Sequence, residues 1–417
     1  MGTSRPLRIC LLSYRGNPAS GGQGVYIKYL SRALRDLGHE VEVISGPPYP
    51  ELPAGVKLHR LPSLDLYNPD HMFRVVNYWD LLKPLNMWEF LVMCTGGFPE
   101  PFTFGRRLYK FLRKRKPSYD IIHDNQCMAY DFLKIPHLGY PFVTTIHHPI
   151  TVDKKTELSE APNIIKKIKV LRWYSFLRMQ LKVAKKLRKI ITVSECSKRD
   201  ISREFGVPLD RFRVVPNGIN TDVFYPLPHI ERLPHHLITT NSADMPLKGL
   251  KYLLYAVDSI RKKRPIHLTV IGQPKKDGEI EKTVKELNLN SHVHFTGRIP
   301  ASDFARYYAK ATMAIVPSLY EGFGMPAGEA MACGVPVIST TGGALPEVVG
   351  DAAYLVPPGN SEALERAIIY LLDHPDERRA LAEAGFRRVQ ESLTWEHAAK
   401  KTVAVYEEEI DDYRRHK

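Results

Sequence analysis

The chain has 417 residues, which is long for a single core and fits two domains of roughly 200 residues each. Its 44% apolar and 25% charged content is ordinary for a globular protein. The five cysteines are scattered, odd in number and in no metal-ligand spacing, which argues against zinc and favours a reducing compartment. The apolar run at the N-terminus is too short for a signal peptide, and no stretch is apolar for the about 18 residues of a membrane span. We therefore expect a cytoplasmic protein, soluble or peripheral at the inner face of the membrane.

The net charge of +14 is distributed unevenly along the chain. Residues 1–222 carry 35 Lys and Arg against 20 Asp and Glu, whereas residues 223–417 carry 24 against 25. The whole excess lies in the N-terminal half. This asymmetry suggests a polyanionic partner for one domain only.

The first half alternates strand-like and helical segments. A strand–helix alternation predicts a parallel, doubly wound sheet, in which ligands bind outside the carboxyl ends of the strands. The expected strands are 7–14, 40–45, 119–124, 142–147 and 189–194, and the expected helices include 25–38 and about 195–205.

A glycine-rich loop follows the first strand and opens the first helix. Backbone N–H groups approach an anion closely where no side chain blocks them, so this loop is a candidate phosphate cradle, with Gly22 as the best single residue. A dinucleotide fingerprint would need a third glycine where the chain has Ile27, which disfavours NAD. A simple strand–helix turn is the alternative.

Two basic runs interleave apolar side chains. Residues 106–116 form one, and residues 161–190 form a longer helical pattern with a stripe of Val170, Trp173 and Leu177. Basic amphipathic helices with aromatic residues are typical of membrane surfaces, so we expect binding to an anionic membrane. The alternative is a core-packed helix with a solvated basic face. No nucleic-acid module is visible, and we expect no nucleic-acid partner.

Segment 63–116 is rich in aromatic residues, Met and Pro and does not fit a bare strand–helix unit. We interpret it as an enlarged segment on the side of the first domain that binds a second substrate, the acceptor. An ordinary core helix with irregular loops is the alternative. Further along, His147 and His148 stand at the end of a buried strand. A histidine there can act as donor or acceptor near neutral pH, although such a position is often only structural.

The alternation ends near 213–226, which we interpret as the end of the first domain and the start of the linker. It then restarts with expected strands at 235–240, 266–272, 292–297, 313–318 and 335–339, and the chain is helical from about Glu362 with two breaks.

The stretch 318–350 is the most informative part of the chain. Glu321 lies on a glycine-rich loop, and Glu329 lies one turn into the next helix. Pro326 suits the first helical turn and Gly334 suits the stop. A helix N-terminus approached by glycine-rich backbone binds anions, and nearby carboxylates accept hydroxyls. Phosphate together with several hydroxyls describes a nucleotide sugar.

This stretch resembles the E-x7-E signature of the retaining glycosyltransferases of family 4. The resemblance covers nearly the whole chain and is strongest at 205–350. It implies an α/β GT-B fold, with two Rossmann-like doubly wound domains facing across a cleft. We expect an acceptor-binding domain at 1–222, a nucleotide-sugar-binding domain at 223–395, and a C-terminal helix at about 396–417 that packs back on the first domain.

The resemblance also implies residue roles. It assigns catalytic roles to His147, Lys248 and Glu321: His147 contacts the reaction centre, Lys248 neutralises the diphosphate, and Glu321 holds the transferred sugar. The expected donor-binding residues are Gly22, Ser242, Lys248, Arg298, Ile299, Glu321, Gly322, Phe323, Gly324, Met325 and Glu329. Ser242 departs from the family, which commonly has an arginine there, so the phosphate site has one bidentate cation fewer unless a basic residue such as Arg298 or Arg15 compensates. The role of His148 stays open.

The expected activity is transfer of a sugar, with retention, from a nucleotide sugar to a hydroxyl of a lipid or lipid-linked acceptor. UDP is the expected nucleotide by family frequency. We expect no cofactor beyond the nucleotide sugar and no metal, since no D-x-D motif falls at the predicted diphosphate site. A soluble small-molecule or polysaccharide acceptor is one alternative. A sugar-nucleotide epimerase of the same fold and a non-catalytic nucleotide-binding protein are the others.

Overall fold

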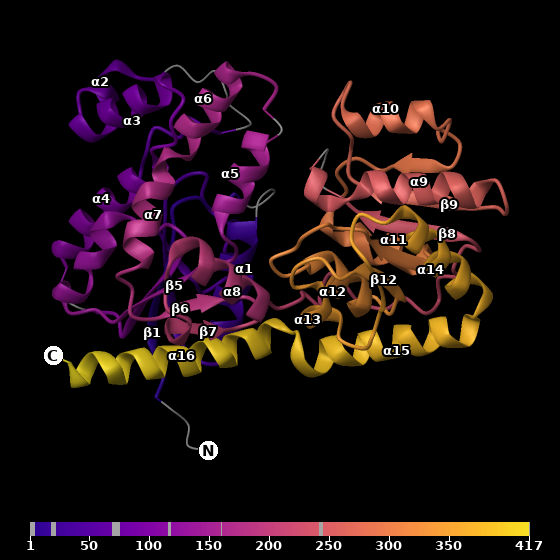
Figure 1. Ribbon diagram of the computed structural model, residues 1–417. Helices are drawn as coiled ribbons and strands as arrows, with labels where there is room; N and C mark the ends of the chain where they lie inside the picture. Colours follow the sequence, from indigo (N-terminus) through magenta and orange to yellow (C-terminus); the bar gives the residue numbers. More distant parts are fainter. Residues whose placement is uncertain are drawn as a thin grey trace. The chain divides into compact units, whose positions relative to one another are not determined.

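The computed structural model describes residues 5–17, 22–68, 76–115, 118–159, 161–241 and 245–416. The contacts divide the chain into two compact units (Figure 1). The first unit consists of Met1–Val193, Ser197–Val215 and Ala398–Lys417, and the second of Ser194–Cys196 and Pro216–His397. Ser242 lies outside the described residues.

The first unit is built on a parallel sheet of seven strands in the order β3-β2-β1-β4-β5-β6-β7. The central pairs are in register at Ile9, which lies opposite Val41 on β2 and Ile121 on β4. The strand order reverses direction between β1 and β4, which makes a doubly wound sheet. Its strands are β1 (Arg8–Ser13), β2 (Glu40–Ser45), β3 (Lys57–Arg60), β4 (Ile121–Asn125), β5 (Phe142–Thr145), β6 (Ile190–Thr192) and β7 (Phe212–Val214).

The α-helices of the first unit surround a core in which Leu12, Leu108 and Ile190 are fully buried. Strand residues that are buried on both faces of a sheet form near-continuous apolar runs, which is why β1, β2, β4, β5 and β6 were predicted. The short strands β3 and β7 are less buried and were not predicted. The helices are α1 (Gly22–Asp36), α2 (Tyr78–Leu81), α3 (Pro84–Cys94), α4 (Glu100–Arg113), α5 (Ile150–Ser159), α6 (Ile164–Trp173), α7 (Leu177–Ala184) and α8 (Glu195–Phe205).

The last helix, α16 (Trp395–Arg415), belongs to the first unit from Ala398 onward. Tyr406 on this helix has its hydroxyl 2.6 Å from Nδ1 of the buried His123 on β4. Farther along, the Lys189 ammonium is held 2.9 Å from both Glu408 and Asp412. The end of the chain therefore supplies buried partners to the first sheet.

The second unit has a parallel sheet of six strands in the order β10-β9-β8-β11-β12-β13, which reverses between β8 and β11. Leu254, Ile315 and Ile368 lie at the centre of its core. The strands are β8 (His236–Thr240), β9 (His267–Ile271), β10 (Val293–Phe295), β11 (Met313–Val316), β12 (Val337–Thr340) and β13 (Tyr354–Val356). The helices are α9 (Leu250–Arg261), α10 (Glu279–Glu286), α11 (Phe304–Lys310), α12 (Met325–Ala332), α13 (Leu345–Val349), α14 (Ser361–Asp373) and α15 (Pro375–Ser392).

The basic segment 161–190 is not one helix. A 3-10 turn at Tyr174–Phe176 separates α6 from α7. The predicted stripe does face inward, since Val170 and Leu177 are buried. The exposed side of α6, however, carries apolar residues as well as lysines: Ile164 is 67% and Ile168 58% exposed.

Candidate active site

The reversal of strand order in the second sheet places the ends of β8 and β11 side by side, and such a position is where open α/β sheets bind ligands. Asn241 follows β8 and Ser318 lies two residues beyond β11. The side chain of Asn241 is buried, and its Oδ1 has no hydrogen-bond partner in the described part of the chain. An unpaired buried acceptor at this edge fits a site that a ligand completes.

Lys248 and Glu321 meet at this edge. The Lys248 Nζ lies 2.8 Å from Glu321 Oε1, and the same oxygen accepts a 2.8 Å hydrogen bond from the Ser318 hydroxyl. Both contacts are made by Oε1, so among the described residues Oε2 has no hydrogen-bond donor. The carboxylate is thus fixed by two neighbours and keeps one oxygen for a further hydroxyl.

Glycines allow the backbones of three loops to pack against one another here. Gly249 has φ of +65°, and a Cβ at this residue would lie 2.0 Å from the carbonyl oxygen of Pro317. Gly343 also has φ of +65°, and its Cβ would lie 2.3 Å from the carbonyl oxygen of Glu321. Only glycine combines this conformation with so close an approach. The sequence analysis assigned no role to Gly249, Gly343 or Ser318.

The short helix α12 begins at this same place. Its N-cap, Gly324, has φ of +103°, and Pro326 stands in the first turn as predicted. The helix ends as expected at Gly334, which has φ of +65° and donates its N–H to the carbonyl of Met331. Gly322 and Phe323 lead into the helix, and Met325 is its first residue. The helix N-terminus therefore lies beside Glu321, since a Cβ at Gly324 would be 3.9 Å from the Cβ of Glu321, and the first N–H groups of the helix have no partner within it.

Glu329 lies on α12 and is half-buried. Burial raises the pKa of its carboxyl to about 7; Lys248 opposes this rise and Glu321 adds to it. No hydrogen bond to this carboxyl is present among the residues that the structure describes. A half-buried carboxyl with a strongly shifted pKa and no partner is typical of a functional site.

We predict that Glu329→Gln becomes more stable relative to the native chain as the pH rises from 5 to 8. The pKa of Glu329 is about 7 in the folded protein and about 4.3 in the unfolded chain, so folding favours the protonated carboxyl. The native protein therefore has its full stability below about pH 4.3 and loses part of it as the pH rises through about 7. Glutamine does not ionise. The gain at pH 8 should be on the order of 2 kcal/mol, measured by denaturant unfolding. The exposed Glu362→Gln on α14 is the control, and a gap that stays constant between pH 5 and 8 would contradict the assignment.

Arg298 and Ile299 follow β10, at the same edge of the sheet but two strands away from β8. Arg298 is exposed and Ile299 half-buried. Gly297 pairs with Gly272, and a Cβ at Gly272 would lie 1.9 Å from the carbonyl oxygen of Asn241. The β10 turn is thereby linked through Gly272 to the end of β8.

In the first unit, His147 lies just beyond β5 and is held by its neighbours. Its Nε2 is 2.7 Å from Oδ1 of Asn125, whose amide nitrogen donates to the carbonyl of Gln23. The amide oxygen must therefore accept from Nε2–H, which leaves Nδ1 with its lone pair. Burial, with a smaller effect of His148, lowers the pKa of His147 to about 3. The imidazole is neutral at physiological pH.

Gln126 is a supporting residue that the sequence analysis did not identify. It has a positive φ of 56°, and its side chain accepts the His147 N–H at 2.8 Å and donates to the His148 carbonyl at 3.1 Å. A non-glycine residue in this conformation is uncommon and is often found at functional sites. The only signal in the sequence is a polar run after the strand. His148 itself turns to Asp153 on α5, with its Nε2 2.8 Å away.

Gly22 is the first residue of α1 rather than part of a preceding loop, and a Cβ there would meet no atom within 4 Å. The close approach occurs at Gly24, where a Cβ would lie 2.2 Å from the carbonyl oxygen of Asn17. Gly24 is thus the sterically required glycine of this turn. Tyr26 in the same helix packs edge-on against His147, with ring centroids 4.7 Å apart.

Two family models match the chain. The model described as Glycosyltransferase Family 4 matches residues 20–223, and the model described as Glycosyl transferases group 1 matches residues 237–388. A curated relative, the "MMP alpha-(1->4)-mannosyltransferase" of Mycolicibacterium hassiacum, is 42% identical over 408 residues, which cover 97% of this chain and 98% of that one. The chain belongs to the family 4 glycosyltransferases. It is a glycosyltransferase, as the E-x7-E stretch predicted.

Solved structures of glycosyltransferases have the same fold. The sucrose-phosphate synthase of Thermosynechococcus elongatus is similar with a TM-score of 0.69 at 25% identity, covering 96% of this chain and 98% of that one. The UDP complex of HepE from Anabaena has a TM-score of 0.66 at 16% identity, covering 96% and 100%. The expected two-domain GT-B fold is confirmed.

The described residues contain neither a membrane-spanning helix nor a cluster of metal ligands. No helix there is both long and apolar enough to cross a bilayer. In the same ranges no three His, Cys, Asp or Glu side chains gather as metal ligands would. Independence of metal stays a prediction.

Proposed function

We propose that this family 4 glycosyltransferase moves a mannosyl group from a nucleoside diphosphate mannose to a hydroxyl of an acceptor sugar, with retention at the anomeric carbon. The observation that carries the proposal is the grouping of Lys248, Glu321 and Glu329 around the start of α12. The sugar is suggested by the name of the Mycolicibacterium relative, which matches 97% of this chain.

The donor site would use these groups as follows. Lys248 and the first N–H groups of α12 stabilise the negative charge that develops on the departing diphosphate. Glu321 Oε2 accepts a hydroxyl of the mannosyl group, while Oε1 stays bound to Lys248 and Ser318. Glu329, in its ionised form, accepts the ribose hydroxyls. Arg298 and Ile299 at the β10 turn would lie near the nucleobase.

Retention follows from the linkage. Nucleoside diphosphate mannose carries its leaving group in the α configuration, so making an α linkage, as the relative's name states for that enzyme, retains the configuration. We propose a same-face reaction in which the departing diphosphate takes the proton of the acceptor hydroxyl. His147, neutral and with Nδ1 available, is proposed to contact the transferred sugar.

The test is an assay of the purified chain with GDP-, UDP- and ADP-linked mannose and glucose, with EDTA present. The acceptors are mannosides with and without an apolar aglycone, and NMR reads the anomeric configuration of the product. The proposal expects mannosyl transfer to form an α linkage without metal. UDP is the nucleotide predicted by family frequency, and the panel decides it. Loss of all activity on adding EDTA would contradict metal independence.

Other outcomes would favour the alternatives. Conversion of the nucleotide sugar without an acceptor indicates an epimerase. Donor binding without turnover on any acceptor indicates a non-catalytic binding protein, an alternative raised by Ser242 in place of arginine.

A lipid-linked acceptor at an anionic membrane is favoured by exposed apolar side chains on three helices of the first unit, α2, α3 and α6, which lie near the top of that unit in Figure 1. These side chains are Tyr78, Trp79, Leu82, Trp88, Leu91, Ile164, Ile165, Ile168 and Leu171. The end of α6 is tied to the end of α3 by Arg172, whose Nη2 is 2.6 Å from the Thr95 hydroxyl. Lys166, Lys167 and Lys169 are exposed among these residues.

Ion pairs within the protein engage some of the cations in the two basic segments that the sequence predicted to bind an anionic membrane. In 106–116, Arg106 pairs with Asp131 and Arg107 with the buried Glu89. In 161–190, Lys189 is buried in its own ion pairs. In the longer segment, the exposed cations that remain for an anionic surface include Lys166, Lys167 and Lys169 on α6, Arg178 and Lys182 on α7, and Lys185 and Lys186 directly after α7.

We predict that the protein floats with anionic vesicles in a salt-sensitive way, and that Ile165→Ser combined with Ile168→Ser lowers the association constant for the vesicles roughly 100-fold. Each isoleucine buried in lipid contributes about 1.5 kcal/mol or more, and the lysines add an electrostatic part that salt screens. Leu209→Ser, at a residue 49% exposed elsewhere in the unit, is the control. Absence of binding, or self-association through these residues in light scattering, would contradict membrane docking.

A further inference from the structure

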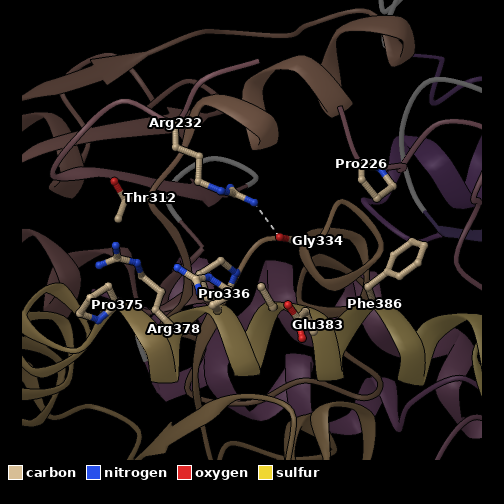
Figure 2. Close-up of a pocket in the computed structure, with 11 residues that line it drawn as sticks. Pro226, Arg232, Thr312, Gly334, Pro336, Pro375, Arg378, Glu383 and Phe386 are labelled. Atoms are coloured by element: carbon tan, nitrogen blue, oxygen red, sulfur yellow. Dashed lines mark hydrogen bonds between the residues drawn. The ribbon is translucent and has the colours of Figure 1, made fainter. Parts of the chain in front are cut away.

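The second unit has a pocket of about 440 Å³ that plays no part in the candidate active site (Figure 2). This volume is within the about 300–1,000 Å³ of ligand pockets. Thr312 and Pro336 line it, and each stands just before a strand, β11 or β12. The pocket therefore opens at the amino ends of the strands, whereas Lys248 and Glu321 lie at the carboxyl ends.

Arginines dominate the charge of this pocket. Arg232, Arg378 and Arg379 line it, with Glu383 as the single carboxylate of the lining. Arg379 is turned to the solvent, with its side chain 72% exposed and 3.7 Å from Asp376. The other two arginines have no carboxylate within salt-bridge distance in the described ranges.

Arg232 is held in place by backbone carbonyls alone. Its Nη1 donates to Ala311 and its Nη2 to Gly334, each at 2.7 Å, and Figure 2 shows the second of these bonds. Carbonyl groups fix the direction of a guanidinium without cancelling its charge. On α15, Arg378 uses Nη1 for the carbonyl of Leu371 at 2.9 Å. Its other N–H donors have no acceptor among the described residues apart from a 3.4 Å contact of the same Nη1.

The two guanidinium groups repel one another. Although Arg232 is exposed overall and Arg378 half-buried, partial loss of solvent around each guanidinium lowers its pKa, and the charge of Arg378 lowers the pKa of Arg232 further. An arrangement of two like charges without a counter-ion costs free energy, which an anion bound near both groups would recover. The planar donor forks of arginine match phosphate oxygens in a bidentate way.

The rest of the lining favours a small organic molecule over a bare ion. Pro226, Pro336, Pro375 and Phe386 supply apolar walls. Glu383 is exposed and makes no hydrogen bond in the part of the chain that is described, so its carboxylate can accept hydroxyls. We propose that this pocket is a second ligand site, separate from the donor site, which binds a phosphate monoester of a sugar through Arg378 and Arg232.

The test is calorimetric titration of the full chain at fixed ionic strength with mannose 6-phosphate, inorganic phosphate and mannose. The proposal expects binding of mannose 6-phosphate that is tighter than that of phosphate, and no binding of mannose. Arg378→Gln should weaken binding about tenfold, because hydrogen bonds to charged groups are strong. Arg366→Gln, an exposed arginine on α14 outside the lining, should leave binding unchanged.

Lys248→Ala separates the pocket from the donor site, which also attracts phosphate. Binding that survives in Lys248→Ala and fails in Arg378→Gln supports the proposal. Binding that fails in Lys248→Ala and survives in Arg378→Gln belongs to the donor site and overturns it, as does the absence of binding at millimolar ligand. Arg232→Gln is a second variant; since it also breaks two bonds to carbonyls, its unfolding must be measured alongside.

Discussion

Lys248→Ala should lower kcat about 100- to 1,000-fold, the usual cost of removing one group that stabilises charge in the transition state. Its ammonium is the cation within 2.8 Å of Glu321, and it opposes the rise in the pKa of Glu329. Without the Lys248 ammonium, the negative charges of Glu321, Glu329 and the diphosphate lie close together and lose the cation that offsets them. We therefore expect a higher donor KM as well as a lower kcat, measured in steady-state assays with nucleoside diphosphate mannose.

A matched control lies three residues farther on. Lys251 is 40% exposed and pairs with Glu279, away from Glu321. Lys251→Ala should leave kcat within about twofold, since exposed ion pairs contribute little. Lys248→Arg keeps the charge but changes the donor geometry, and partial activity is expected. If Lys248→Ala kept more than a third of the native kcat, the proposed role at the diphosphate would be wrong.

Gly249→Ala should destabilise the protein by about 2–4 kcal/mol and reduce activity to near background. The left-handed backbone at this residue costs an alanine roughly 1–2 kcal/mol, and the added methyl group would lie 2.0 Å from the Pro317 carbonyl oxygen. Relief requires the turn that carries Lys248 to move away from the loop that carries Glu321. The measurement is denaturant unfolding together with donor binding.

Gly334→Ala separates the free-energy cost of the left-handed backbone from the cost of the close contact with Pro317. Gly334 has the same φ of +65°, but its nearest atoms to a new Cβ lie 3.8 Å away, at Pro226. This variant should lose only the backbone part, about 1 kcal/mol. Equal losses of unfolding free energy in the two variants would mean that the Pro317 carbonyl moves away from the added methyl group at little cost. The turn would then not hold Lys248 in place.

Local patterns in the sequence predicted the elements that depend on local chemistry. The apolar strands, Pro326 in the first turn of α12 and Gly334 at its end all follow from backbone geometry and burial. The pair of carboxyls was also recognisable, because its spacing and the surrounding glycines lie within one stretch. The glycines that matter through distant contacts were not: Gly249 is needed because of Pro317, far along the chain.

The break in the 161–190 segment has the same origin. Trp173 and Phe176 both pack on Phe98, with ring centroids 5.0 and 5.4 Å away, and these contacts favour a turn between α6 and α7 that helical periodicity did not show. The ion pairs that engage Arg107 and Lys189 likewise join distant residues. The pocket lined by Arg232 and Arg378 was the hardest feature to predict, since these two residues lie near opposite ends of the sequence of the second unit.

The place of α16 in the first unit has a consequence for biosynthesis. Residues 216–397 leave the ribosome before the partners of His123 and Lys189, which are Tyr406, Glu408 and Asp412. Domains usually complete their folding in the order in which they are made. Here the first unit completes its folding only after residues 216–397 have been made, and until α16 has emerged Lys189 lacks the carboxylates that pair with it. Truncation of the chain near residue 397 would therefore destabilise the first unit, although most of that unit precedes residue 216 in the sequence.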